Sequence, residues 1–485
     1  MMLKEILKSM SIEWIQGKNV EIEDIVIDSR KVQYGSLFIC LKGLQADGHL
    51  FIKDAVSAGA SAIIISDYQT EYPANVTIVK ADNTRKALAI AAANYFYHPS
   101  EAFNLIGVTG TKGKTTTTFM MEAVLQQFKH RTGVIGTLGA KIGGQKLDIH
   151  YDTSTTPDPV ELQRIFSAMK DDKVNDVVVE VSSQALAFHK LEGVQFNTAI
   201  FTNLSQDHLD FHKTMDNYMK AKAILFQQCR QGIVNVDCEA GRYILEHSPC
   251  DFLTFSIDSQ SDIKAENIRY LKNGVEFIVQ IDSEPIDFFV PIKGRFTVYN
   301  ALGVIGAALT MKIPALNIKK ALSAMRGVPG RIQDVPNTKG LHVIVDYAHS
   351  PDAIVNIINA VREFTKGRVI ILFGCGGDRD AVKRPIMGKI AGELADYCII
   401  TSDNPRNEDP MEIINSIVEG LKETNCEYEI EADRRDAIFK GVGILKPEDA
   451  LIVAGKGHED YQTIGTENIH FDDVEVAREA LESIR

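Results

Sequence analysis

The segment GTKGKT, residues 110–115, has the composition of a loop that holds a phosphate group. It follows the apolar run NLIGV and precedes TTTTFMMEAVLQQF, which predicts a strand, a tight loop and a helix in that order. Glycines allow backbone N–H groups to surround a phosphate, Lys114 supplies a positive charge, and the Thr115 hydroxyl is a ligand for Mg²⁺. A plain glycine-rich turn is the alternative. The spacing predicts a nucleoside triphosphate site made of Gly110, Thr111, Lys112, Gly113, Lys114, Thr115 and Thr116.

A magnesium ion beside such a loop needs an acidic ligand, and Glu180 is the candidate. Glu180 ends the apolar run DVVVE, which predicts a buried strand followed by Ser182 and Ser183. Ligands collect at the carboxyl ends of parallel strands, so a carboxylate there is well placed to hold Mg²⁺. The alternative is an edge carboxylate without a metal.

A second group of polar residues lies in TNLSQDHLDFH, residues 202–212. The segment lacks the H-E-x-x-H spacing of a zinc peptidase. It is either a solvated loop or a second metal site, and the phosphate loop upstream favours His208 as a ligand of a second magnesium ion. Further on, NYMKAKAILF predicts an amphipathic helix, in which composition alone would make Lys220 and Lys222 surface residues.

Three polar loops follow strand-like runs in the C-terminal part of the chain: GCGGDRD, TSDNPRNEDP and AGKGHEDYQ. The first lacks the third glycine of a dinucleotide fingerprint, so a dinucleotide site is disfavoured. Arg379, Arg406 and Glu459 lie in these loops and could converge on one polar ligand. Ordinary turns are the alternative.

Composition limits the classes of protein. The chain has 485 residues, 45% of them hydrophobic and 24% charged, which excludes a disordered or fibrous protein. A net charge of −13 disfavours binding to nucleic acid or an anionic membrane. No apolar run is long enough for a membrane span, and charges at Lys4, Glu5 and Lys8 disfavour a signal peptide. Seven cysteines without a C-x-x-C pair indicate reduced thiols, so we expect a cytoplasmic protein.

Short β-rich runs alternate with helical stretches, which predicts an α/β protein with mainly parallel sheets. The helix-breaking pair His98-Pro99 and the turn-rich segment GVPGRIQ are candidate boundaries. They predict three domains, residues 1–98, 99–330 and 331–485.

Together these motifs resemble the Mur ligase family, and the resemblance extends over essentially the whole chain. Beyond the phosphate loop no single motif is specific, but their ordered set is. In order they are DSR, GTKGKTT, TTP, EVSS, TNLSQDHLDFH, the Ala221-Lys222 pair, YN, GR, DYAHSP, GGDRD, DNPR and GKGHE.

The resemblance implies an N-terminal domain that binds a UDP-linked substrate, a central ATP-binding domain and a Rossmann-like C-terminal domain that binds an amino acid. It implies an ATP-dependent amide ligase that adds meso-diaminopimelate to UDP-N-acetylmuramoyl-L-alanyl-D-glutamate through an acyl phosphate, in peptidoglycan precursor synthesis. It also implies that Lys222 is carbamylated and becomes a carboxylate-like metal ligand. The implied catalytic residues are Lys114, Glu180, His208 and Lys222, and the implied Mg²⁺ ligands are Thr115, Glu180, His208 and Lys222.

The same resemblance implies three binding sets. Asn300, Arg331 and Asp346 complete the ATP site. Ser29, Thr155, Thr156, Ser182 and Lys190 bind the UDP-linked substrate. The amino acid contacts Arg379, Asp403, Asn404, Pro405, Arg406, Gly455 and Glu459.

The resemblance also implies the choice of amino acid, because family members that select diaminopimelate carry the tetrad DNPR, here residues 403–406, and lysine-adding members usually differ at its second and fourth positions. The physical reason is that a guanidinium can bind the distal carboxylate that lysine lacks. Two departures from the family pattern are His189-Lys190, where relatives usually have an arginine, and Thr297, where asparagine is common. They leave room for a paralogue with a related substrate. We expect a monomer acting on small molecules, with no nucleic-acid or membrane partner.

Two other classes stay open from the sequence. A ligase that adds L-lysine, or one of the folylpolyglutamate type, would share the central and C-terminal motifs. A P-loop kinase would need neither Lys222 nor the DNPR loop.

Overall fold

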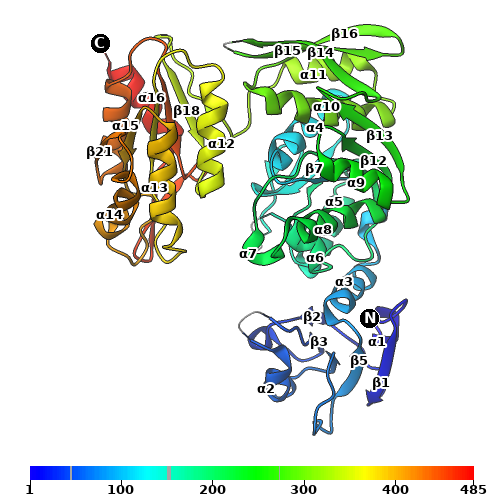
Figure 1. The fold of residues 1–485 in the computed structure, drawn as a ribbon. Helices are drawn as coiled ribbons and strands as arrows, with labels where there is room; N and C mark the ends of the chain where they lie inside the picture. Colours follow the sequence, from blue (N-terminus) through cyan, green and yellow to red (C-terminus); the bar gives the residue numbers. More distant parts are fainter. Residues whose placement is uncertain (44–45, 150–154, 272, 485) are drawn as a thin grey trace. The chain divides into compact units, whose positions relative to one another are not determined.

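The computed structural model describes residues 1–43, 46–149, 155–271 and 273–484 (Figure 1). The chain divides into two compact units. One comprises Met1–Phe255 with Gly306–Ile313, and the other comprises Ser256–Ile305 with Pro314–Arg485. No helix of the described residues is long and apolar enough to span a membrane.

The first unit begins with a five-stranded sheet in the order β1-β5-β4-β3-β2, parallel except for β1. Successive residues of β3 face opposite sides: Leu37 and Ile39 pack with helix α3, and Phe38 packs with α2. Both faces of the sheet are therefore buried. The elements are α1 (Leu3–Ile6), β1 (Ile12–Gln16), β2 (Asp24–Val26), β3 (Ser36–Ile39), α2 (Ile52–Ser57), β4 (Ala62–Ile65), β5 (Thr77–Ala81) and α3 (Thr84–Tyr95), with short 3₁₀ helices η1 (Ser29–Lys31), η2 (Gly48–Phe51) and η3 (Pro99–Ala102).

The second sheet of this unit has six parallel strands in the order β13-β12-β11-β6-β10-β7. The strand order changes direction about β6, and ligands bind at such a point in α/β sheets. β8 (Gly139–Ile142) and β9 (Gln145–Lys146) add antiparallel strands beside β7. The other elements are β6 (Asn104–Thr109), α4 (Lys114–Gln127), β7 (Thr132–Gly136), α5 (Pro159–Asp171), β10 (Asp176–Glu180), α6 (Ser183–Ala187), β11 (Phe196–Phe201), α7 (Leu209–His212), α8 (Met215–Gln227), β12 (Cys229–Asn235), α9 (Glu239–His247) and β13 (Asp251–Ser256).

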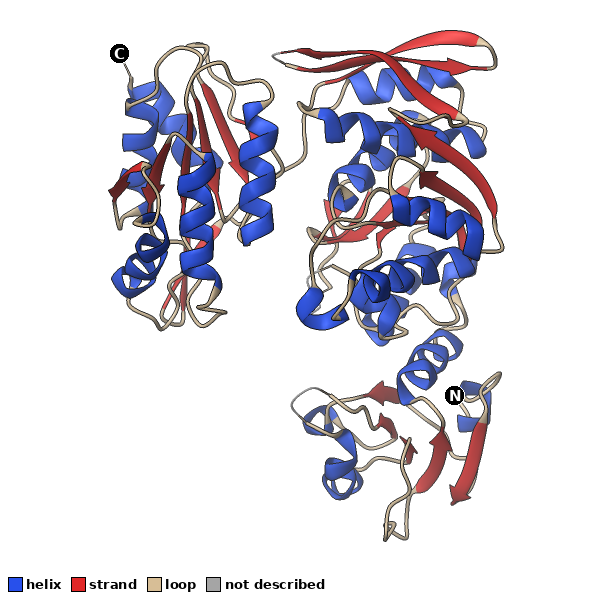
Figure 2. Ribbon diagram, viewed as in Figure 1, coloured by secondary structure: helices blue, strands red, loops and turns tan. Residues whose placement is uncertain are grey.

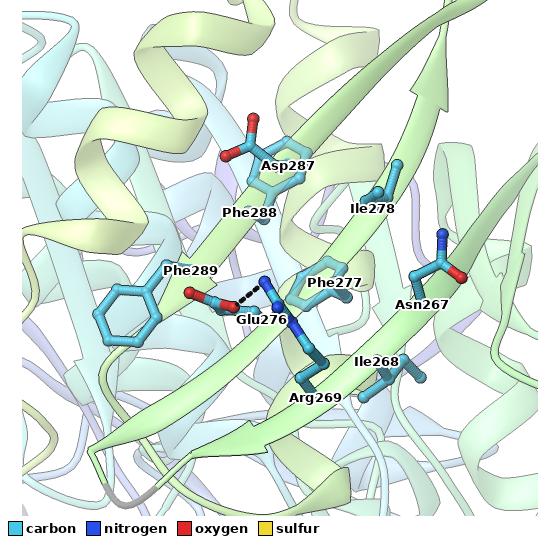
Figure 3. A pocket seen from close by; sticks show the side chains of 9 residues that line it. All are labelled: Asn267, Ile268, Arg269, Glu276, Phe277, Ile278, Asp287, Phe288 and Phe289. Atoms are coloured by element: carbon cyan, nitrogen blue, oxygen red, sulfur yellow. Dashed lines mark ion pairs between the residues drawn. The ribbon is translucent and has the colours of Figure 1, made fainter.

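The second unit contains three antiparallel strands, β14 (Ile263–Leu271), β15 (Gly274–Ile281) and β16 (Glu284–Val290). Helix α11 (Ala315–Ser323) packs against β16. All three strands line a groove of about 450 Å³. Two of its lining residues, Arg269 on β14 and Glu276 on β15, are register partners and form an ion pair (Figure 3). Helix α10 runs from Arg295 to Thr310, and its residues from Gly306 onward are assigned to the first unit.

The remaining sheet of the second unit has the order β17-β18-β22-β19-β20-β21, parallel except for β17. Helices cover both of its faces (Figure 2): α12, α13 and α14 pack on one, and α15 and α16 on the other. The predicted α/β class with mainly parallel sheets is thus confirmed. The elements are β17 (Gln333–Asp334), β18 (His342–Asp346), α12 (Pro351–Arg362), β19 (Val369–Phe373), α13 (Lys383–Leu394), β20 (Tyr397–Ile400), α14 (Pro410–Leu421), β21 (Glu427–Ile430), α15 (Arg434–Gly443), β22 (Ala450–Ala454), β23 (Tyr461–Ile464), β24 (Glu467–His470) and α16 (Asp473–Ser483).

Candidate active site

The predicted phosphate loop connects β6 to α4. Gly110 has φ +153° and Gly113 has φ +84°, and a Cβ at Gly110 would overlap the hydroxyl of Thr202. Only glycine fits position 110. The Lys114 ammonium donates to the carbonyls of Gly110 and Thr111, both at 3.0 Å. The loop therefore presents backbone N–H groups and a cation at a helix N-terminus, which suits a phosphate chain.

The residues that follow β11 hold this loop from the other side. Asn203 accepts a hydrogen bond from the Lys112 N–H and donates one to the Lys112 carbonyl, both at 3.1 Å. The Thr202 hydroxyl donates to the same carbonyl at 2.6 Å. The sequence places these residues at a strand end but does not reveal this role. Their part follows from the parallel pairing of β11 with β6.

Two predicted magnesium ligands meet in the structure. The Thr115 hydroxyl donates to the Glu180 carboxylate at 3.0 Å, and this carboxylate is buried. Thr137, which sequence analysis does not identify, also donates to Glu180, from its N–H at 3.2 Å and its hydroxyl at 3.0 Å. Hard oxygen donors beside a phosphate loop match the preference of Mg²⁺.

Lys222 is not a surface residue, because only 1% of it is exposed. Its ammonium nitrogen lies 4.6 Å from the centre of the Tyr218 ring. Burial lowers the pKa of Lys222 well below its usual value, and the charge of Lys114 adds to the effect while Asp207 opposes it. A lysine whose pKa is lowered by burial releases its proton more readily than a solvated lysine does.

Tyr218 is the centre of the cluster around Lys222. The ring of His208 lies 6.1 Å from it edge-on, and the ring of His212 stacks on it at 4.8 Å. His212 in turn lies within hydrogen-bond distance of Ser183, at 2.9 Å. His208 remains 47% exposed. Tyr218 is not among the residues predicted from the sequence, although its i, i+4 spacing from Lys222 places both on one helix face.

Three of the residues predicted to bind the UDP-linked substrate gather beside Glu180. The Thr156 hydroxyl donates to the Glu180 carbonyl at 2.8 Å and accepts from the Ser182 N–H at 3.0 Å. The Thr155 hydroxyl lies 3.3 Å from that of Thr137. Ser29 lies in η1 and has no hydrogen bond to this group among the described residues.

Lys190 forms an ion pair with Asp158 at 2.6 Å. A guanidinium is nevertheless present nearby, because Arg85 lies over the ring of Phe188 at 4.3 Å. Burial lowers the pKa of Arg85, and the charge of Asp158 opposes this effect. The pair His189-Lys190, which stands where relatives usually have an arginine, thus has an arginine from helix α3 nearby.

The structure brings the three polar C-terminal loops together. Asn404 donates to Glu459 at 2.9 Å. The buried ammonium of Lys456 donates to the Asn404 side-chain oxygen at 3.2 Å and to Glu459 at 3.3 Å. Lys456 is a residue that sequence analysis misses, since a loop lysine gives no local sign of burial.

Backbone contacts interlock the same loops. Arg406 has φ +51°, and its guanidinium donates to the Gly377 carbonyl at 2.8 Å. A Cβ at Gly377 would overlap the Pro405 carbonyl. At Gly455, φ is +116° and a Cβ would overlap the Asp403 carboxylate. Arg379 belongs to the first loop and is exposed.

Of the three remaining residues predicted for the ATP site, two lie together. Arg331 stacks over Tyr347 at 5.1 Å, and its charge acts on the adjacent Asp346. Asp346 accepts the Ile332 N–H at 2.8 Å, and burial raises the pKa of its carboxyl while Arg331 opposes the rise. Asn300 lies on α10, and its buried amide nitrogen has no hydrogen-bond partner among the described residues. That nitrogen suits an acceptor on a ligand.

Three family models match the chain in succession. Residues 21–96 match the Mur ligase family, catalytic domain. Residues 108–308 match the Mur ligase middle domain, and residues 330–457 match the Mur ligase, glutamate ligase domain. The chain belongs to the Mur ligase family and is an ATP-dependent ligase, as its motifs predict.

Relatives and a solved structure agree with this assignment. The UDP-N-acetylmuramoyl-L-alanyl-D-glutamate--2,6-diaminopimelate ligase of Clostridium botulinum is 46% identical, with all of both chains covered. Ligase 1 of that name from Clostridium acetobutylicum is 44% identical, again over both whole chains. A solved structure of a protein with the same name superposes with a TM-score of 0.68 at 29% identity, covering 95% of each chain.

Proposed function

We propose that this ligase joins meso-diaminopimelate to UDP-N-acetylmuramoyl-L-alanyl-D-glutamate, with ATP as the energy source, in peptidoglycan precursor synthesis. The observation that carries the proposal is the interlocked group of Asn404, Arg406, Lys456 and Glu459, which combines both signs of charge in one place. Such a group matches an amino acid with two amines and two carboxylates. The names of the full-length relatives support the same substrates.

The first step is phosphoryl transfer. A γ-carboxylate oxygen of the D-glutamyl residue attacks the γ-phosphorus of ATP, and ADP leaves, so that an acyl phosphate forms. Lys114 and the N–H groups of the phosphate loop neutralise the phosphates, which is the main contribution a protein makes to this chemistry. Thr115 and Glu180 would hold a magnesium ion, which supplies charge neutralisation between the phosphate oxygens.

The second step forms the amide. The neutral amine of diaminopimelate attacks the acyl carbon, and the tetrahedral intermediate loses phosphate and a proton. Asp403, Asn404, Pro405, Arg406, Gly455, Glu459 and Arg379 are proposed to bind the amino acid, with Arg406 on its distal carboxylate. Lysine has no distal carboxylate, so its binding would leave the Arg406 guanidinium without that partner and would be disfavoured.

Lys222 is proposed to act as a carbamate. Its amine adds to carbon dioxide, an N–C bond forms, and a proton leaves, so a cation becomes an anion. The lowered pKa of Lys222 favours this reaction because only the neutral amine is nucleophilic. With His208 it would hold a second magnesium ion.

Ser29, Thr155, Thr156, Ser182 and Lys190 are proposed to hold the UDP-linked substrate, and Asn300, Arg331 and Asp346 to complete the ATP site. The proposed domains remain 1–98, 99–330 and 331–485, and each family match falls within one of them to within a residue. A cytoplasmic monomer stays our prediction.

Phosphate release with ATP, Mg²⁺ and the UDP-linked dipeptide tests the proposal, with meso-diaminopimelate compared with L-lysine. Release that needs diaminopimelate is expected. Release with L-lysine alone would be consistent with a ligase but would contradict the proposal that Arg406 selects diaminopimelate. Phosphate release without any amino acid, and without a new amide, would favour a kinase.

A further inference from the structure

Two cysteines lie against each other in the C-terminal sheet, one on a strand and one just before the neighbouring strand. Cys398 belongs to β20, and Cys426 immediately precedes β21, which pairs in parallel with β20. Their sulfurs are 3.8 Å apart. The proposed reaction uses neither thiol.

The two thiols differ in access. Cys398 is completely buried, whereas Cys426 is half-buried and lines an open depression of about 510 Å³. A reagent in the depression therefore meets Cys426 first. The Cys398 thiol shares its hydrogen with the Cys426 sulfur, which lowers the pKa of Cys426 and raises that of Cys398. Burial opposes the lowering of the Cys426 pKa, and so do the charges of Asp396 and Glu427.

The depression is acidic. Its lining includes four carboxylates, Glu393, Asp396, Glu423 and Glu427. Lys389 pairs with Glu423, and Arg362 pairs with Asp396. Two cations thus balance only part of the negative charge. A cationic reagent is attracted to this surface and an anionic one is repelled.

We propose that Cys426 and Cys398 form a dithiol modification site that reacts with small cationic organic disulfides. The Cys426 thiolate attacks one sulfur of the reagent, and a small thiolate leaves and takes up the proton that Cys426 released. The Cys398 sulfur then attacks the Cys426 sulfur, and its proton passes to the second departing sulfur, which leaves as a small thiol. The protein dithiol is oxidised by two electrons and the small disulfide is reduced to two thiols.

Closing the bond brings the sulfurs from 3.8 Å to about 2.0 Å. The chain ahead of β21 supplies this movement, because Asn425 and Cys426 lie outside the strand. The bond closes a loop between two positions 28 residues apart, which restricts the unfolded chain.

The test treats the full-length protein with cystamine, blocks remaining thiols with iodoacetamide, and maps peptides by mass spectrometry. A Cys398–Cys426 cross-link is expected. Cys398→Ala, which avoids burying a hydroxyl, should accumulate one cysteamine adduct on Cys426. Cys426→Ser should leave Cys398 unmodified. Cys229 and Cys250, a second hydrogen-bonded thiol pair at the starts of β12 and β13, provide an internal reference, and Cys250→Ser should leave the cross-link intact.

Charge selectivity gives an independent readout. Cystamine should react at Cys426 on the order of ten-fold faster than anionic oxidised glutathione, and salt should narrow the difference. A stable adduct on Cys426 in the unmodified sequence, modification of Cys398 in Cys426→Ser, or faster reaction with the anionic disulfide would overturn the proposal. Because these readouts do not involve ligation, they are independent of the proposed function.

Discussion

Arg434 and Asp473 form a fully buried ion pair, with Nε–Oδ1 and Nη2–Oδ2 both at 2.7 Å. The same guanidinium donates to the carbonyls of Ser402 at 3.3 Å and Ala454 at 2.9 Å. These carbonyls belong to the segments that follow β20 and end β22. One cation thus links the origins of two of the loops proposed to bind the amino acid.

Removing one partner of this pair should destabilise the protein strongly. Arg434→Met leaves the Asp473 carboxylate buried without a counter-charge, at a cost of about 3–5 kcal/mol. Urea unfolding measures the change, and exposed Arg435, which pairs with Glu479, is the control through Arg435→Met. The double variant Arg434→Met, Asp473→Leu should recover part of the loss. Equal midpoints for all variants would show that the pair does not stabilise the fold.

Lys222→Ala should lower ligation by at least about a hundred-fold, because the proposed carbamate ligand is lost. Added bicarbonate should restore little of it. Lys220→Ala is the matched control, since Lys220 lies on the same helix and pairs with Asp216 at the surface. Carbon-13 bicarbonate should give a carbamate NMR signal in Lys220→Ala but not in Lys222→Ala. Full activity of Lys222→Ala would exclude the role.

Arg406→Ala should raise the KM for diaminopimelate by about ten- to a hundred-fold, since a charge-assisted contact is lost. The KM for ATP should change little. Arg435→Ala serves as the exposed control. An equal loss of affinity for both substrates would show that Arg406 maintains the structure rather than selecting the amino acid.

Glu180→Gln should weaken the binding of Mg²⁺ and reduce kcat by on the order of a hundred-fold, because a neutral amide replaces the anionic ligand. The hydroxyls of Thr115 and Thr137 keep a hydrogen-bond partner at position 180 in this variant. When the ligation rate is measured against Mg²⁺ concentration, the concentration that gives half the maximal rate should be higher than in the unmodified protein. Glu122→Gln, a buried glutamate on α4, is the control. An unchanged Mg²⁺ dependence would remove Glu180 from the metal site.

Stability should depend on pH through Asp346. Burial raises its pKa in the folded state above the unfolded value of about 3.9, so the folded state holds this proton more tightly. The free energy of unfolding should therefore fall as pH rises from the unfolded pKa through the folded one. Asp346→Asn should flatten this part of a urea-midpoint profile, and Asp352→Asn should not. An unchanged slope in Asp346→Asn would contradict the assignment.

Local sequence was sufficient to predict the strand, glycine turn and helix around residues 110–115 and the place of Glu180 at a strand end, because these elements are consecutive in the chain. Thr137 was missed because it reaches Glu180 only through the pairing of β7 with β10. Tyr218 could have been found from its spacing to Lys222. The burial of Lys456 could not have been predicted in this way, since it depends on two partners. Asn404 follows another strand, β20, and Glu459 lies across the turn after β22.

The glycines at 377 and 455 limit how this enzyme can be redesigned. Any side chain at either position would push one loop of the group into its neighbour. Libraries that seek a new amino-acid substrate should therefore hold these two positions constant and vary exposed Arg379 and its neighbours. The backbone of these loops then keeps its conformation, and the selectivity for the amino acid is changed through side chains alone.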